Sequence, residues 1–119
     1  MAESIIAIKS LAFAVKIVNL YKHLCDDKHE YVLSKQLLRS GTSIGANVSE
    51  GKYGQTMPDF ITKLSIALKE ASETEYWLKL LFATDYITET EYSSLNADSE
   101  EILKMLTAAL KTAKKKYSE

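Results

Sequence analysis

The chain has 119 residues, a formal charge of −1 at neutral pH and a single cysteine, Cys25. This length supports one domain with one core, and 46% apolar with 26% charged residues is typical of a globular protein. One cysteine excludes an internal disulfide framework and suits a reducing compartment. Because the chain does not open with a secretory signal, and no apolar stretch approaches the ~20 residues of a membrane span, we expect a cytoplasmic protein. A negative net charge argues against a monomer that binds nucleic acid through its overall charge.

Apolar residues at helical spacing predict a first helix over about residues 4–26, with Ser4 as its N-cap. The residues expected on its buried face are Ile8, Leu11, Ala12, Val15, Val18 and Leu24. The polar segment DDKHE ends this helix, and a second helix is predicted over about residues 30–53.

The segment LLRSGTSIGANVSEG, residues 37–51, holds three of the four glycines. It is not a P-loop, because the Gly-Lys-Ser/Thr ending is missing and no strand precedes it, and no βαβ unit surrounds it as in a dinucleotide site. Each helical glycine costs up to about 1 kcal/mol relative to alanine, which close approach of a neighbouring helix offsets. We therefore predict that the second helix packs tightly through small residues. The helical register places on its inward face Ser40, Gly41, Ile44, Val48 and Gly51.

A third helix is predicted over about residues 57–85, with Thr56 as N-cap and Pro58 in its first turn. A fourth, over about residues 88–117, opens with the capping-box pair Thr88 and Glu91. Four helices with short links and no strand predict an all-α fold, an antiparallel up-down-up-down four-helix bundle that forms a single domain over residues 1–119.

Glu75 interrupts the apolar face of the third helix, and an inward carboxylate needs a partner. Arg39 is the only arginine and pairs with carboxylates in a bidentate manner, so we predict a buried Arg39–Glu75 ion pair. Two interpretations of such a pair stay open, namely a device that fixes the register of two helices and a functional pocket.

Two segments, LLRSGTSIGANVSEG and FITKLSIALKEASETEYWLKLL, closely resemble the family of bacterial 23S rRNA intervening-sequence proteins, sometimes called S23 ribosomal proteins. The resemblance covers about residues 8–117. The matching positions of the first segment are Arg39, Ser40, Ser43, Ile44, Asn47, Val48, Glu50 and Gly51. Those of the second are Ala67, Leu68, Glu70, Glu73, Glu75 and Trp77.

The resemblance implies a four-helix bundle that assembles into homo-oligomeric rings, often pentamers, and associates with RNA or DNA, with no established catalytic residue. The chain is also distantly similar to the accessory bundle protein of diversity-generating retroelements, a basic pentamer that binds nucleic acid. It departs from this pattern in charge, since the segment KYGQTMPDF after Gly51 carries only Lys52 as a basic residue. Affinity for nucleic acid rises with the number of phosphates neutralised.

Two functions follow as hypotheses. The first is a non-enzymatic oligomeric module that contacts RNA or a ribonucleoprotein partner; its candidate contact residues are Lys35, Arg39, Lys52, Lys111, Lys114, Lys115 and Lys116. The terminal lysines have a structural interpretation too, because cations stabilise a helix C-terminus. The alternative is a protein-interaction scaffold with no nucleic-acid role, which would use a second apolar face of the third helix. The candidate oligomer surface there comprises Ile66, Trp77 and Leu81. A tryptophan such as Trp77 is more often a packing residue at the bundle edge than a binding hot spot.

The sequence gives no support for catalysis. His23 and His29 lie across a helix end without metal-ligand spacing, and Cys25 has no base in register. No Glu-x-x-His pair, as in di-iron bundles, occurs in the chain. We expect no catalytic residue, no cofactor and no bound metal.

Overall fold

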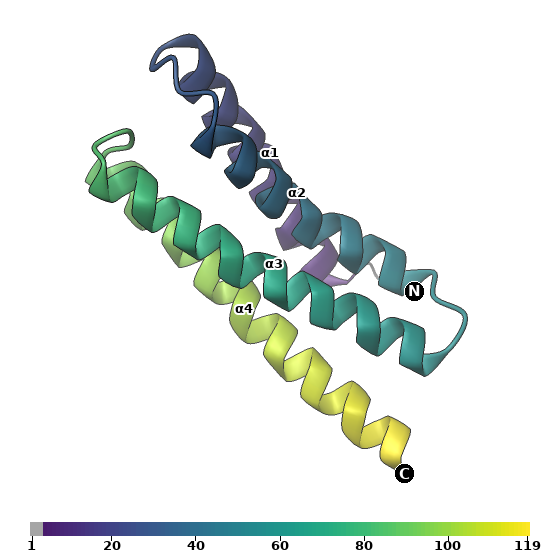
Figure 1. Ribbon diagram of the computed structural model, residues 1–119. Helices are drawn as coiled ribbons and strands as arrows, with labels where there is room; N and C mark the ends of the chain where they lie inside the picture. The colour runs from purple at the N-terminus through teal and green to yellow at the C-terminus, as the bar shows by residue number, and fades with distance from the viewer. Residues whose placement is uncertain (1–3) are drawn as a thin grey trace.

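The computed structural model describes residues 4–119 and contains four helices: α1 (Ile5–Asp26), α2 (Leu33–Lys52), α3 (Met57–Ala83) and α4 (Glu89–Ser118). Each helix packs on two neighbours, and the α1–α4 seam is the least extensive of the four. The start of α1, the α2–α3 link and the C-terminus lie at one end of the bundle, and the other two links lie at the opposite end (Figure 1). The predicted all-α, up-down-up-down fold is confirmed. None of the four helices, over these residues, has the length and apolar character that crossing a membrane requires.

Side-chain caps set the start of three helices where the sequence predicted them. The Ser4 hydroxyl accepts the Ala7 N–H at 3.5 Å, and the Thr56 hydroxyl accepts the Asp59 N–H at 3.2 Å. The capping box of α4 is complete: the Thr88 hydroxyl accepts the Glu91 N–H at 3.1 Å, and the Glu91 carboxylate accepts the Thr88 N–H at 2.8 Å. These bonds satisfy N–H groups that have no partner inside the helix.

The second helix begins at Leu33, three residues later than the predicted start at residue 30. Glu30 folds into the link instead, and its carboxylate accepts the N–H groups of Val32, Leu33 and Ser34 at 3.2, 3.1 and 2.6 Å. The Glu30 N–H donates to the Leu24 carbonyl at 2.9 Å, which ties the link to the end of α1. Glu30 is therefore the cap of α2 and not its first residue.

The buried side of α1 differs from the one expected from the sequence, although Leu24 is buried as predicted. Ile8, Leu11 and Val15, predicted to be buried, are 50%, 66% and 53% exposed. Aliphatic residues occupy both sides of α1 between residues 5 and 18, so periodicity alone does not select the inner side. The residues that α1 does bury are Ser10, Phe13, Ile17, Leu20 and Leu24.

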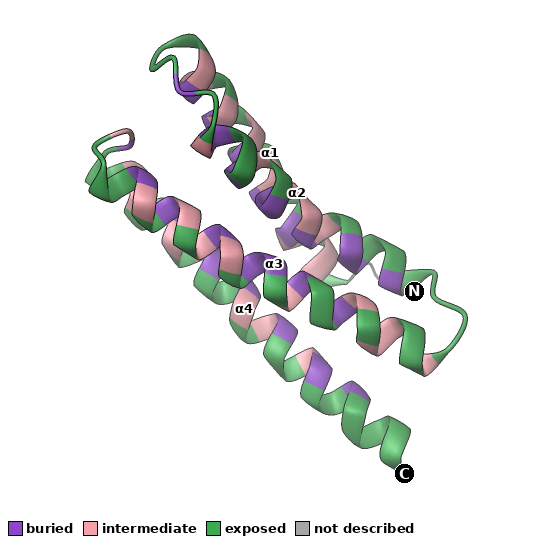
Figure 2. Cartoon of the chain, in the orientation of Figure 1, coloured by how far each residue is buried: buried purple, intermediate pink, exposed green. Residues whose placement is uncertain are grey.

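The predicted inward side of α2 is buried: Ser40, Gly41, Ile44, Val48 and Gly51 all have buried side chains or backbone. A Cβ atom on Gly41 would lie 2.8 Å from Cγ2 of Ile17 in α1, and one on Gly51 would lie 3.2 Å from Cβ of Lys63 in α3. The two glycines thus bring α2 close to both of its neighbours. Figure 2 shows the buried residues of α2 and α3 as bands along these helices.

Candidate functional site: the polar seam between α2 and α3

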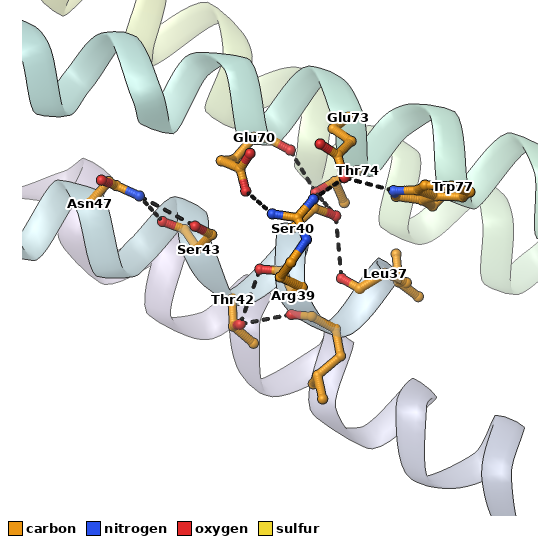
Figure 3. A network of polar contacts seen from close by, with 11 residues as sticks. Leu37, Arg39, Ser40, Thr42, Ser43, Asn47, Glu70, Glu73, Thr74 and Trp77 are labelled. Carbon is orange, nitrogen blue, oxygen red and sulfur yellow. Dashed lines mark hydrogen bonds and ion pairs between the residues drawn. The ribbon is translucent and has the colours of Figure 1, made fainter. Parts of the chain in front are cut away.

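Polar side chains from α2 and α3 meet in the middle of the interface between the two helices (Figure 3). We call this group the polar seam; it consists of Arg39, Ser40, Glu70, Glu73, Thr74 and Trp77. The α3 members have the i, i+3, i+4, i+7 spacing of one helix face, and this face is turned toward α2.

Arg39 bridges two carboxylates of α3. One terminal nitrogen of its guanidinium donates to the Glu70 carboxylate at 2.8 Å, and the other pairs with Glu73. The indole N–H of Trp77 also donates to Glu73, at 3.0 Å. The bond from Trp77, together with Arg39, lowers the pKa of the Glu73 carboxyl below its usual range although partial burial opposes this shift. Glu73, followed by Glu70, raises the pKa of Arg39.

The predicted Arg39–Glu75 ion pair is wrong. The buried side of α3 passes through Glu70, Thr74 and Leu81, so the carboxylates turned toward α2 are Glu70 and Glu73. Glu75 is half-buried, with Glu100 of α4 and, one turn along α3, Lys79 as its charged neighbours. Burial first, and the Glu100 charge second, raise the pKa of the Glu75 carboxyl.

Beneath the ion pairs lies a buried hydroxyl pair. The Thr74 hydroxyl donates to the Glu70 carbonyl at 2.8 Å and lies 3.0 Å from the Ser40 hydroxyl, and both residues are fully buried. Further along α2, the Asn47 side-chain amide donates to the Ser43 carbonyl at 2.8 Å. Each of these groups is satisfied by a neighbour in the bundle, as buried polar groups require.

The polar seam holds α2 and α3 together. One cation sits between two anions, and the indole N–H and both hydroxyls have bonding neighbours inside the seam, so the arrangement fixes the rotation and register of α3 against α2. Arg39 is a poor contact for phosphate because its charge is already shared by Glu70 and Glu73. A second cross-link, Lys63 to Glu50 at 2.8 Å, joins the same helices nearer the α2–α3 link.

The other residues proposed to contact nucleic acid lie in two separate places on the molecule. Lys35 is exposed near the start of α2, far from the rest along the bundle. The remaining residues are exposed at the end of the bundle that holds the C-terminus (Figure 2). We call them the lysine end; they are Lys52, Lys111, Lys114, Lys115 and Lys116.

The three residues predicted to form an oligomer surface on α3 do not form one exposed surface. Leu81 is 0% exposed and belongs to the core, because it continues the buried row of Ala71, Thr74 and Leu78. Trp77 is half-buried, and its N–H is held by Glu73. Only Ile66 remains open to solvent as predicted.

The prominent apolar surface lies on α1 and was missed. It consists of Ile5, Ile8, Leu11 and Val15, which we call the α1 apolar face. The signal in the sequence was that α1 is apolar on both sides, a property of helices that pack on both sides. Its nearby charges, Lys9 and Lys16, point to the α4 flank, where they pair with Glu101 at 2.9 Å and Asp98 at 2.6 Å.

A groove of about 380 Å³ runs beside this face, between α1 and α2. Small side chains line most of it, including Ala14, Gly45, Ala46 and Ser49. Leu11 is one of its lining residues and is exposed, so an aliphatic residue of the α1 apolar face and the groove lie next to each other.

Across residues 4–119, no three His, Cys, Asp or Glu side chains come close enough to hold a metal ion. The lone thiol, Cys25, is half-buried, with its sulfur 3.8 Å from the Glu30 carbonyl.

Comparison with known proteins gives the family. The family model of the 23S rRNA-intervening sequence protein matches residues 2–108. A crystal structure of a protein of unknown function from the S23 ribosomal protein family of Bacteroides thetaiotaomicron VPI-5482 is 59% identical. The match covers 90% of this chain and 99% of that one, with a TM-score of 0.89. The comparison with curated proteins found no match. The chain therefore belongs to the 23S rRNA-intervening sequence protein family.

Proposed function

We propose that this protein is a non-catalytic helical module that assembles with copies of itself through the α1 apolar face. The observation that carries the proposal is the exposure of four aliphatic side chains along one side of a helix whose other side already fills the core. Contiguous exposed apolar surface of this kind is typical of protein–protein contacts. The polar seam then has the role of keeping α2, and with it α1, in a fixed position.

The same side of the molecule offers both halves of a contact. The projecting Leu11 and Val15 of one copy match the groove of small residues beside α1 in the next copy, as ridges fit grooves in helix packing. A contact between two different patches repeats from copy to copy and closes into a ring when the rotation permits. Resemblance to the family favours a pentamer.

Light scattering after size-exclusion chromatography tests the assembly. We expect an oligomer for the wild type and a monomer for the double variant Leu11→Gln, Val15→Gln, which replaces exposed apolar groups without adding charge. Ile66→Gln, at an exposed aliphatic position on α3, is the control and should remain oligomeric. A monomeric wild type at micromolar concentration would overturn the proposal.

A second candidate function is contact with RNA through the lysine end. Its support is the exposure of four lysines within the last eight residues of α4, at the same end as Lys52. A protomer of net charge −1 has little overall attraction for RNA, but a ring with parallel long axes would gather the lysine ends of all its copies.

Filter binding to a structured RNA at several salt concentrations tests this second function. The triple variant Lys111→Gln, Lys114→Gln, Lys115→Gln should bind more weakly, and its log–log salt slope should fall by about 2 per protomer in contact. Exposed lysines elsewhere supply the control, Lys22→Gln, Lys28→Gln, Lys35→Gln. Equal losses in the two triple variants would show that only total charge matters, and absence of binding at low salt would exclude the function.

A further inference from the structure

A hollow of about 520 Å³ opens at the lysine end, where all four helices contribute to its walls. Its apolar lining comes from Ile6, Ala7, Val48, Phe60, Leu64 and Ala109. Protein interiors are close-packed, and a hollow of this size lies within the 300–1,000 Å³ range of small-molecule sites. It shares no side chain with the polar seam or the α1 apolar face, and it shares Ala7 and Lys52 with the groove between α1 and α2.

The walls of the hollow select an aliphatic ligand. Val48 and Leu64 belong to the core, and Phe60 packs against it, so a molecule in the hollow would extend the core outward. Within residues 4–119, the polar side chains that line the hollow are those of Ser4 and Lys52. A ligand with several donors and acceptors along its length would leave them without partners against such walls, which is unfavourable.

The rim of the hollow selects a negative headgroup. Lys52 takes part in none of the ion pairs within residues 4–119. Its ammonium group lies 5.6 Å from the centre of the Tyr53 ring. Ser4 caps α1 at the same rim, so the positive end of that helix is directed there as well. Of the lining residues that belong to the described part of the chain, none is acidic.

We propose that this hollow binds a medium-chain carboxylate, with the alkyl tail among the apolar residues of the four helices and the carboxylate at Lys52. A chain of about ten carbons, at ~30 Å³ for each heavy-atom group, occupies roughly 300 Å³ and fits the hollow with room for water at its mouth. The ligand class follows from apolar walls that accept an alkyl chain and a cationic rim that accepts its charge.

Isothermal titration calorimetry of the full chain with octanoate, nonanoate and decanoate, below their micelle-forming concentrations, tests the tail. We expect saturable binding that tightens about fourfold for each added methylene group. Ala109→Phe places a ring in the hollow and should abolish binding. Ala97→Phe makes the same change at an exposed position of α4 outside the hollow and should bind as the wild type does.

The headgroup is tested by Lys52→Gln, a surface change that does not threaten folding. It should weaken decanoate binding about threefold to tenfold and leave binding of the neutral decanol unchanged, whereas Lys35→Gln should alter neither. Absence of saturable heat with decanoate would overturn the proposal. The proposal would also be overturned if folded Ala109→Phe bound decanoate as tightly as the wild type does. Equal loss of decanol and decanoate binding in Lys52→Gln would overturn it as well.

Discussion

At the scale of single residues, the spacing of α1 and α2 depends on the missing side chain of Gly41. A methyl group there would lie 2.8 and 2.9 Å from two side-chain carbons of Ile17, a stiff, fully buried β-branched residue. At Gly45, one turn further along α2, the nearest atom to an added Cβ is a Ser10 oxygen at 3.4 Å, which is an ordinary contact. Two glycines of one helix therefore have different roles.

We predict that Gly41→Ala destabilises the protein by about 1–2 kcal/mol, because overpacking outweighs the ~1 kcal/mol gained in helix propensity. Gly45→Ala should be neutral or more stable by up to about 1 kcal/mol, since the propensity gain meets no clash. Urea unfolding followed by circular dichroism measures both free energies of unfolding. Equal effects at the two positions would show that the close approach at Gly41 is not a constraint.

The partner of Arg39 can be established with double-mutant cycles. Arg39→Met and Glu70→Gln should show a coupling energy of about 0.5–2 kcal/mol, because each removes one half of a contact in which Glu70 is nearly buried. Arg39→Met and Glu75→Gln should be additive within about 0.5 kcal/mol. Glu75→Gln alone should be neutral or stabilising at pH 7, because burial and the Glu100 charge, only partly offset by Lys79, disfavour the Glu75 carboxylate. Coupling to Glu75 and none to Glu70 would reverse the assignment.

At the scale of the helices, the start of α2 depends on a carboxylate that lies before it in the chain. Burial acts to raise the pKa of Glu30, but the bonds donated by Ser34, Leu33 and Val32 outweigh it, so the pKa of this carboxyl lies below its usual value. A residue with a lowered pKa in the folded state stabilises the fold only while it is ionised. Glu30 thus makes the α1–α2 connection sensitive to acid.

We predict that Glu30→Gln lowers the free energy of unfolding by about 1 kcal/mol at pH 7, as removal of a helix cap does. The contribution of the Glu30 charge is fully present above the unfolded pKa of about 4.3 and disappears as the pH falls through the lower, folded pKa. Urea unfolding at pH 7 and near pH 3 should therefore give a difference between wild type and variant that shrinks in acid. A difference that stays constant between the two pH values would contradict this role for the charge.

The sequence was sufficient for the number and order of the helices and for the caps of α1, α3 and α4, because Ser4, Thr56 and the Thr88–Glu91 pair are local signals. The sequence was insufficient for features that depend on how one helix is rotated about its axis relative to another. Periodicity could not select the inner side of α1, which is apolar on both sides, nor decide which glutamate of α3 faces Arg39. The α2 cap was missed because the side chain of Glu30 reaches forward from the link and is not at the position of a usual N-cap.

At the scale of the whole molecule, the surfaces proposed for assembly and for RNA binding are arranged so that assembly can bring several lysine ends together. The α1 apolar face starts at the first turn of α1, at the same end of the bundle as the lysine end. The molecule is a rod with principal extents of 51 × 24 × 20 Å, so copies that join side by side with parallel axes place their lysine ends together. Assembly would then convert weak single contacts into a multivalent one.

We predict that Leu11→Gln, Val15→Gln, which changes no charge, lowers affinity for a structured RNA by about 100-fold or more through loss of multivalency. The steepness of the salt dependence should fall at the same time toward that of one lysine end. Filter binding with the two proteins at equal protomer concentration measures both quantities, with Ile66→Gln as the variant expected to behave as wild type. If the variant is monomeric but binds RNA as tightly as the wild type, each protomer carries a complete site. In that event assembly and RNA binding are separate properties of the bundle, and the lysine end needs no neighbour to act.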